Sequence, residues 1–383
     1  MFVYADNAAT TRVLPKVLEA MLPYFTEQYG NPSSTYPLGQ EASRALIGSR
    51  ETIARLLGCR PREITFTSGG SESDNQALRT AAAWGKKHGR THLIASAIEH
   101  HAILHTLEAL QKEGFAVTLL PVNRKGQVEP DTLARALTSE TALVSVMTAN
   151  NETGALQPIR ELAALAHEQG ALFHTDGVQA LGHVPVTLEA GNIDFLSGSA
   201  HKFHGPKGVG FLFTKQGIEL ENLIFGGEQE RGKRAGTENV PGIVGMAAAL
   251  EEAVHNLDAN ARKMAEARDA LEAKLLALGG TRVHSGQVPR LPGHLNMAFD
   301  GVPAEALLPV LGMAGICVSA GSACASGSPE PSHVLLALGC TPEEARSSLR
   351  FSLGDDITRE QVDYTAQTLI REVQRLRQLE HRL

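Results

Sequence analysis

The chain has 383 residues, a net charge of −7 and 37 glycines, with 43% of residues hydrophobic and 20% charged. A single domain usually has roughly 100 to 200 residues, so this length favours two, and the composition is typical of an α/β protein with many tight turns. Because the sequence has no dense Lys/Arg run, no secretory signal pattern and no stretch of about 18 apolar residues, we expect a cytoplasmic protein that binds neither nucleic acid nor a membrane.

The predicted elements of the first half alternate between helix and strand. Pro15 opens an amphipathic helix, and a second helix is expected over 40–57. The apolar residues at helical spacing in the first are Leu18, Met21, Leu22 and Phe25. The β-prone run 64–67 then breaks into a Ser/Gly turn, and further apolar runs follow at 92–95, 116–120, 142–147, 171–173, 193–196 and 209–213. Such alternation predicts a mostly parallel sheet.

The second half is helical at first. Residues 240–278 look helical almost throughout, strand-like runs follow at 294–299 and 349–353, and the last run has one apolar face, as an amphipathic C-terminal helix should. We predict a large domain and a smaller one that also takes the N-terminal segment: 14–255, and 1–13 with 256–383.

A Ser/Gly-rich segment, residues 68–74, lies between a predicted strand and a predicted helix. Exposed backbone N–H groups and the helix dipole at such a turn favour a phosphate. Gly70 lets the backbone approach closely, and Ser71 adds a hydroxyl. Taken alone, the pattern is explained equally well as a helix cap.

Two more segments follow predicted strands. Lys202 comes just beyond the run 193–196, at the edge of the sheet where α/β folds bind ligands. A desolvated lysine there can form a Schiff base with an aldehyde cofactor, although a lysine between two histidines is usually a solvated surface residue. Asp176 could keep a pyridinium nitrogen protonated, and capping of the next turn explains it about as well. Turn chemistry also explains residues 150–154.

Together these segments resemble the fold-type I pyridoxal-phosphate enzymes of the class V aminotransferase family, and specifically the cysteine desulfurases. Several long motifs in one order make the resemblance specific over nearly the whole chain: 4–11, 30–34, 67–75, 150–154, 199–208 and 231–239. The resemblance implies a large domain with a mostly parallel seven-stranded sheet flanked by helices, a smaller α+β domain, and pyridoxal 5'-phosphate as cofactor.

The resemblance also implies a role for each residue that matches a family motif. Lys202 forms the Schiff base, Asp176 pairs with the ring nitrogen, Gln179 meets the ring hydroxyl, and His100 stacks over the ring and assists catalysis. The phosphate is held by Gly70, Ser71, Ser199 and His201. Thr237 is expected to reach the phosphate of the neighbouring subunit, which implies a homodimer.

Three residues are expected to meet the substrate, L-cysteine. Arg350 matches the arginine that clamps the substrate carboxylate, a task suited to its bidentate fork, and Asn151 contacts both substrate and cofactor. Cys324, in the loop 319–331, matches the nucleophile of the group I branch, whose loop is long and mobile. Sulfur would remain on Cys324 as a persulfide while alanine leaves. The persulfide would then pass to an iron-sulfur scaffold or another acceptor protein, with Cys324 as a candidate transient cluster ligand.

Two alternative functions remain, and the sequence differs from the family motifs at a few positions. Selenocysteine lyase activity is the nearest alternative, since that substrate differs by one atom. A non-catalytic scaffold is another, which the intact Lys202, Asp176 and Cys324 disfavour. Ser71 and Ala200 stand where relatives often have Thr and Gly, and residues 174–177 differ slightly around the aspartate, which bears on phosphate geometry rather than on activity.

Other histidines and cysteines are assigned no role. His101 and His105 are spaced i, i+4, which suits metal ligation, but without an evident third ligand a surface role is favoured and no metal is expected. Cys59, Cys317 and Cys340 are interpreted as unreactive thiols.

Overall fold

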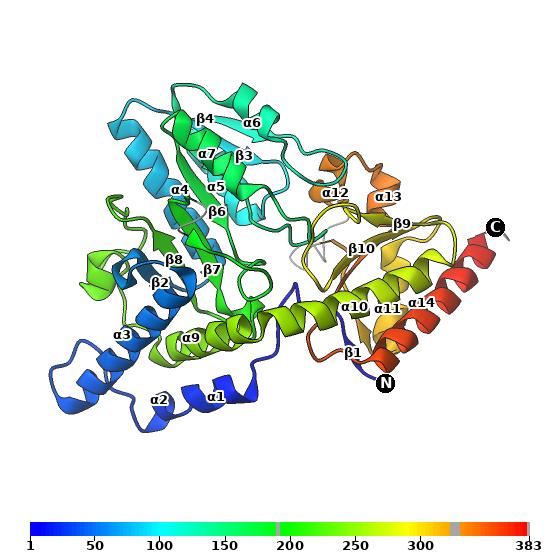
Figure 1. Cartoon of the computed structure of the whole chain (residues 1–383), viewed down its shortest axis with the longest axis horizontal. Coiled ribbons are helices and arrows are strands. Elements are labelled where there is room, and N and C mark those ends of the chain that lie inside the picture. Colours follow the sequence, from blue (N-terminus) through cyan, green and yellow to red (C-terminus); the bar gives the residue numbers. More distant parts are fainter. Residues whose placement is uncertain (189–191, 322–329, 381–383) are drawn as a thin grey trace.

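The computed structural model describes residues 1–188, 192–321 and 330–380. Its larger part is built around a mostly parallel seven-stranded sheet, the large sheet, seen on the left in Figure 1. Its strands are β2 (Ile64–Thr67), β3 (His92–Ser96), β4 (Ala116–Leu120), β5 (Thr141–Ser145), β6 (Leu172–Asp176), β7 (Phe195–Ser199) and β8 (Gly210–Thr214). The spatial order is β2-β8-β7-β6-β5-β3-β4, and only β8 is antiparallel to its neighbours. The predicted sheet is confirmed.

Helices cover both faces of the large sheet. One face packs against α4 (Gly70–Lys87) and α5 (His101–Lys112). The other packs against α3 (Pro37–Leu57), α6 (Pro130–Ala136), α7 (Ile159–Glu168) and α9 (Val240–His255). Leu93 and Ile94 are neighbours on β3 but belong to different hydrophobic cores, because successive side chains of a strand point to opposite faces.

The predicted N-terminal helix is wrong in its extent. The stretch forms two short helices, α1 (Pro15–Met21) and α2 (Pro23–Thr26), since Pro23 has no backbone N–H with which to continue α1. Met21 is buried, but Leu18, Leu22 and Phe25 are 48%, 53% and 57% exposed. The apolar face predicted from the sequence is therefore not covered within one chain.

The remaining residues build a second core around a small antiparallel sheet. Within the described residues this sheet has the order β12-β10-β9, and a separate parallel pair joins β1 to β11. These strands are β1 (Val3–Tyr4), β9 (Thr281–His284), β10 (His294–Phe299), β11 (Ile316–Cys317) and β12 (Ser348–Ser352). The helices are α10 (Leu257–Leu276), α11 (Ala304–Met313), α12 (His333–Ala337), α13 (Pro342–Arg346) and α14 (Arg359–Glu380). None of the described helices is long and apolar enough to cross a membrane.

We propose that the division into 14–255, and 1–13 with 256–383, separates two domains. In support, the core around the small sheet takes members from both ends of the chain, such as Val3 and Leu369, and none from the larger range. The pairing of β1 with β11 explains how the N-terminal segment joins that core.

Candidate active site

Residues predicted to bind a cofactor or take part in catalysis lie at one edge of the large sheet. Asp176 is the last residue of β6 and therefore lies within the strand, whereas the sequence predicted a strand over 171–173 that ends before it. Lys202 ends a 3-10 turn that directly follows β7, and Gly70 begins α4 shortly after β2. Since β2, β6 and β7 run in the same direction, their carboxyl ends meet at one edge, where α/β folds place ligands.

A cavity of about 210 Å³, the ring cavity, opens at this edge. Every predicted site residue lines it except Thr237 and Cys324: Gly70, Ser71, His100, Asn151, Asp176, Gln179, Ser199, His201, Lys202 and Arg350. Thr237 lines a neighbouring cavity of about 230 Å³ with Ser68 and Gly208, so its predicted reach into a partner subunit stays a prediction. Cys324 lies outside the described residues.

The first turn of α4 forms an anion cradle. A cavity of about 430 Å³ lies against it, lined by Gly69, Gly70, Ser71, Ser199, His201 and Lys207 among others, and most of these residues also line the ring cavity. A Cβ at Gly70 would lie 2.7 Å from Cγ2 of Val178, so only glycine fits there. The first N–H groups of a helix have no partner within it, and together with hydroxyls and a lysine they suit a phosphate.

The N-terminal segment holds Lys202 in place. Lys202 Nζ donates to the backbone carbonyls of Ala8 and Ala9, the latter at 2.9 Å. Gln179 Nε2 donates to the same Ala8 carbonyl at 3.0 Å. Sequence reasoning assigned no site role to Ala8 or Ala9, because their contribution comes from backbone carbonyls rather than from side chains.

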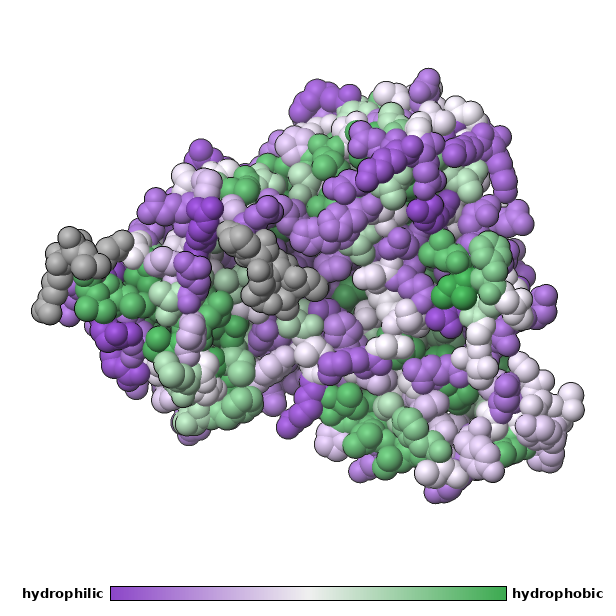
Figure 2. All heavy atoms as spheres, turned by 180° about the vertical axis from the view of Figure 1, so that it is seen from behind, coloured by the Kyte–Doolittle hydropathy of each residue, from purple (hydrophilic) through white to green (hydrophobic). Residues whose placement is uncertain are grey.

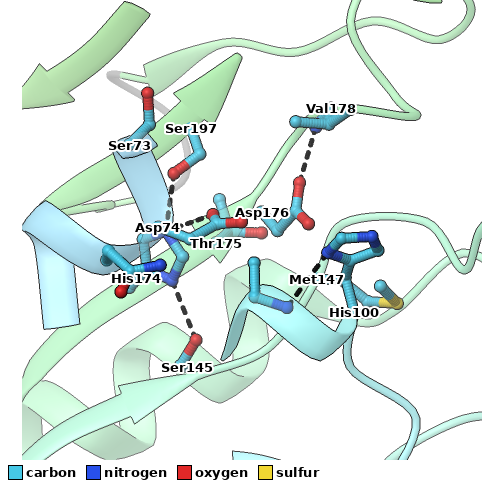
Figure 3. Close-up of polar contacts among 12 residues, drawn as sticks. Ser73, Asp74, His100, Ser145, Met147, His174, Thr175, Asp176, Val178 and Ser197 are labelled. Atoms are coloured by element: carbon cyan, nitrogen blue, oxygen red, sulfur yellow. Dashed lines mark hydrogen bonds and ion pairs between the residues drawn. The ribbon is translucent and has the colours of Figure 1, made fainter. Parts of the chain in front are cut away.

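Asp176 is buried and His100 is half-buried, and the pKa shifts of these two residues, both labelled in Figure 3, leave them with different charges at pH 7. Burial raises the pKa of Asp176 to about 6, against the effect of a 2.9 Å hydrogen bond from the Val178 N–H and of the Lys202 charge. Burial and then the Lys202 charge lower the pKa of His100 to about 4. His100 Nδ1 accepts the Ala102 N–H at 3.2 Å, so the neutral ring carries its proton on Nε2.

Arg350, on β12, is 1% exposed and paired with an acid. Its NH2 group donates to Asp6 Oδ1 at 2.8 Å and its NH1 group to the Asn151 carbonyl at 3.1 Å. Asp6 Oδ2 in turn accepts from Ser319 Oγ at 2.9 Å. Arg350 Nε is buried and has no hydrogen-bond partner among the described residues, so one charged N–H group of this side chain is left unsatisfied.

The structure adds a third histidine to the pair seen in the sequence. The His101 ring centroid lies 5.1 Å from that of His105 and 4.8 Å from that of His333. Even so, within the described ranges no group of three or more His, Cys, Asp or Glu is placed to hold a metal ion. Burial also raises the pKa of Cys59 to about 12, which keeps that side chain a thiol.

Known proteins resemble this chain over nearly its whole length. The profile of the family described as Aminotransferase class-V matches residues 3–365. Cysteine desulfurase IscS of Clostridium botulinum is 49% identical over 383 residues, which cover 98% of this chain and 96% of the relative. Cysteine desulfurase IscS of Methanosarcina thermophila is 47% identical over 377 residues, covering 98% and 93%. A solved structure described as a NifS-like protein matches with a TM-score of 0.91 and 39% identity, covering 98% of this chain and 100% of that one.

Proposed function

This chain belongs to the class-V aminotransferase family, and we propose that it is a cysteine desulfurase that uses pyridoxal 5'-phosphate to convert L-cysteine to L-alanine and a persulfide on Cys324. The observation that carries the proposal is the ring cavity, in which Lys202, Asp176 and Arg350 meet beside an anion cradle. The full-length similarity to proteins named cysteine desulfurase supports the choice of reaction.

The residues of the two cavities fit the cofactor. The α4 cradle suits its phosphate, the Asp176 carboxylate suits a protonated ring nitrogen, and Gln179 suits the ring hydroxyl. Orphaned polar atoms that line the ring cavity, such as Arg350 Nε, are consistent with a ligand there. When bound, the cofactor supplies an aldehyde that captures an amine and a ring that accepts electrons from the substrate Cα.

The protein residues then orient the substrate and move its protons. Arg350 holds the substrate carboxylate, with Asn151 beside it. Lys202 removes the proton from Cα once its amine is deprotonated. Neutral His100, whose Nδ1 is occupied, is arranged to donate from Nε2 rather than to accept the thiol proton of Cys324. This arrangement gives His100 a stacking and donating role.

The sulfur transfer is a nucleophilic substitution at sulfur. The Cys324 thiolate forms a bond to the substrate sulfur as the Cβ–S bond breaks, and the electron pair stays with the carbon, which takes up a proton to give alanine. An unperturbed thiol, with a pKa near 8.5, is only a few per cent ionised at pH 7, so this step is expected to accelerate with rising pH.

We include in the proposal a cytoplasmic homodimer that passes its sulfur to an acceptor protein such as an iron-sulfur scaffold. The dimer is supported by apolar side chains exposed on one chain, including Leu18, Leu22 and Phe25 in the segment 15–26 and Phe225, which is 83% exposed. Figure 2 shows hydrophobic patches towards the lower edge of the molecule. A partner subunit covering such patches would remove this apolar surface from water.

The decisive experiment measures alanine release from L-cysteine in the presence of a thiol reductant. We expect the wild type to release alanine and Cys324→Ala to bind the cofactor without turnover. Cys340→Ala, which removes a half-buried thiol outside the ring cavity, is the matched control and should retain activity. Full activity in Cys324→Ala would contradict the nucleophile, and release of alanine only from L-selenocysteine would favour selenocysteine lyase activity instead.

A further inference from the structure

A second carboxyl lies beside Asp176 that the proposed mechanism does not use. Asp74, on α4, is 1% exposed and lines the same ring cavity as Asp176. Its Oδ1 atom has no hydrogen-bond partner in the part of the chain that the structure describes. Figure 3 shows Asp74, on α4, lying between His174 and Asp176 of β6. Two acids therefore share one buried site.

His174 is close enough to Asp74 to form an ion pair but does not carry the charge for one. Its Nε2 lies 3.6 Å from Asp74 Oδ1. The ring is fully buried between two hydroxyls, with Nδ1 2.8 Å from Ser145 Oγ and Nε2 3.1 Å from Ser197 Oγ. Burial lowers the pKa of His174 to about 3, so the imidazole is neutral at neutral pH and cannot balance a carboxylate.

A third buried acid, Glu99, completes the cluster. Glu99 accepts hydrogen bonds from Ser96 Oγ at 2.5 Å and from the Met147 N–H at 2.9 Å. Burial nevertheless raises its pKa to about 8, and the charge of Asp176 acts in the same direction. The pKa of Asp74 is raised well above its usual range by burial first, and then by Asp176 and Glu99.

Of these three acids, only Asp176 has a positively charged neighbour, Lys202, that lowers its pKa. Asp176 also accepts the Val178 N–H at 2.9 Å. Hydrogen bonds also lower the pKa values of the other two, from Ser197 to Asp74 and from Ser96 and Met147 to Glu99, but they bring no positive charge. Like charges in a buried site cannot all be ionised, so the proton leaves the acid with the best support for a charge.

We propose that Asp74 is a positioning residue for Asp176: it remains a neutral acid at neutral pH, so that the buried cluster holds a single negative charge, on Asp176. The consequence is a carboxylate ready to pair with the protonated ring nitrogen of pyridoxal 5'-phosphate. The inference rests on the proposed function, since it concerns how the chain receives that cofactor, and it assigns Asp74 no contact with the reacting atoms.

Infrared spectroscopy of the full-length holoenzyme tests the protonation state directly. We expect a protonated carboxylic acid band at pH 7 that Asp74→Asn removes. Glu99→Gln should remove a separate band and serves to assign the two acids. If Asp74→Asn instead removes only ionised carboxylate absorption at pH 7, the proposal is overturned.

Cofactor affinity gives a second readout that does not depend on turnover. Asp74→Asn keeps the charge of the cluster, so the dissociation constant for pyridoxal 5'-phosphate should change by less than about threefold. Asp176→Asn removes the single charge and should weaken binding by about tenfold or more. A loss in Asp74→Asn as large as that in Asp176→Asn would show that Asp74 is charged, and would overturn the proposal.

These outcomes separate the inference from the proposed function. A protein that binds the cofactor, shows the Asp74 band and releases no alanine contradicts the desulfurase activity and leaves the role of Asp74 intact. A protein that releases alanine but has an ionised Asp74 at pH 7 contradicts only the inference.

Discussion

The two ends of the ring cavity limit unbalanced buried charge by different means, protonation at one end and ion pairing at the other. At the end formed by the large sheet, Asp74 lies beside the neutral imidazole of His174, and burial raises the pKa of Asp74 and of the neighbouring buried acid Glu99. At the other end, buried Arg350 is matched by Asp6 at 2.8 Å. The difference teaches that one end avoids excess charge by protonation and the other by ion pairing, as expected for acids that can take up a proton and an arginine that cannot lose one.

The largest expected effect concerns the pH dependence of stability set by Glu99. Its pKa is raised from 4.5 to about 8 in the folded protein, so the stability that protonated Glu99 contributes is full below pH 4.5 and is lost as the pH rises towards 8. Glu99→Gln should therefore gain stability relative to the wild type between pH 5 and pH 9, by roughly 4 kcal/mol at about 1.4 kcal/mol per pKa unit. Urea unfolding at several pH values measures this, and parallel curves for the two proteins would contradict it.

At the end of the ring cavity that holds the Asp6–Arg350 ion pair, loss of one charge should lower the stability of the folded protein. Asp6→Asn leaves buried Arg350 without its acid, and we expect the free energy of unfolding to fall by about 3 kcal/mol at pH 7. Glu252→Gln is the matched control, because it breaks a 2.7 Å pair with Lys16, whose side chain is 77% exposed. That change should cost less than about 1 kcal/mol. Equal losses in the two variants would remove the distinction between buried and surface pairs here.

Removing the cation at that end tests function more than stability. Arg350→Gln deletes the fork that is proposed to bind the substrate carboxylate, and kcat/KM for alanine release should fall by about 100-fold. The absorbance of the bound cofactor should persist, since the cradle at α4 is untouched. A normal KM for L-cysteine in this variant would argue against the substrate role of Arg350.

The smallest expected effect comes from the hydrogen bond that Ser319 donates to Asp6, the acid of the ion pair. Ser319→Ala removes the hydroxyl that donates to Asp6 Oδ2 at 2.9 Å, while the Arg350 contact with Oδ1 remains. We expect a loss of about 1 kcal/mol in unfolding free energy. A loss as large as that of Asp6→Asn would mean that Ser319, and not the ion pair, holds this end of the cavity together.

Sequence reasoning performed well where the signal is local. The Ile64–Thr67 strand and the turn into α4 follow from apolar runs and glycine turns, and the structure confirms these elements. The strand predicted over 171–173 is also present, but it extends to Asp176. Sequence reasoning was wrong about the N-terminal helix, because helical spacing alone does not reveal that Pro23 divides the stretch. The exposure of Leu18 and Phe25 is likewise not encoded in the spacing of apolar residues.

The site residues also divide into those that a local motif predicted and those that depend on contacts between distant segments. Motif resemblance named ten residues that line the ring cavity, since each belongs to a short recognisable segment. The pairing of Asp6 with Arg350 and the burial of Asp74 beside Asp176 were not predicted. Each of these depends on segments that are far apart in the chain, and no local pattern records which of them will meet.

The sequence by itself determined the order of strands and helices, the fold class and the chemical groups available at the sheet edge, because these follow from apolar periodicity, turn residues and side-chain type. Only the tertiary structure decided which groups are charged. Asp74, Glu99 and Asp176 are all ordinary acids in the unfolded chain, and folding separates them through burial and through the Lys202 charge that acts on Asp176. The physical reason is that the cost of a charge depends on its surroundings, and distant segments supply those surroundings.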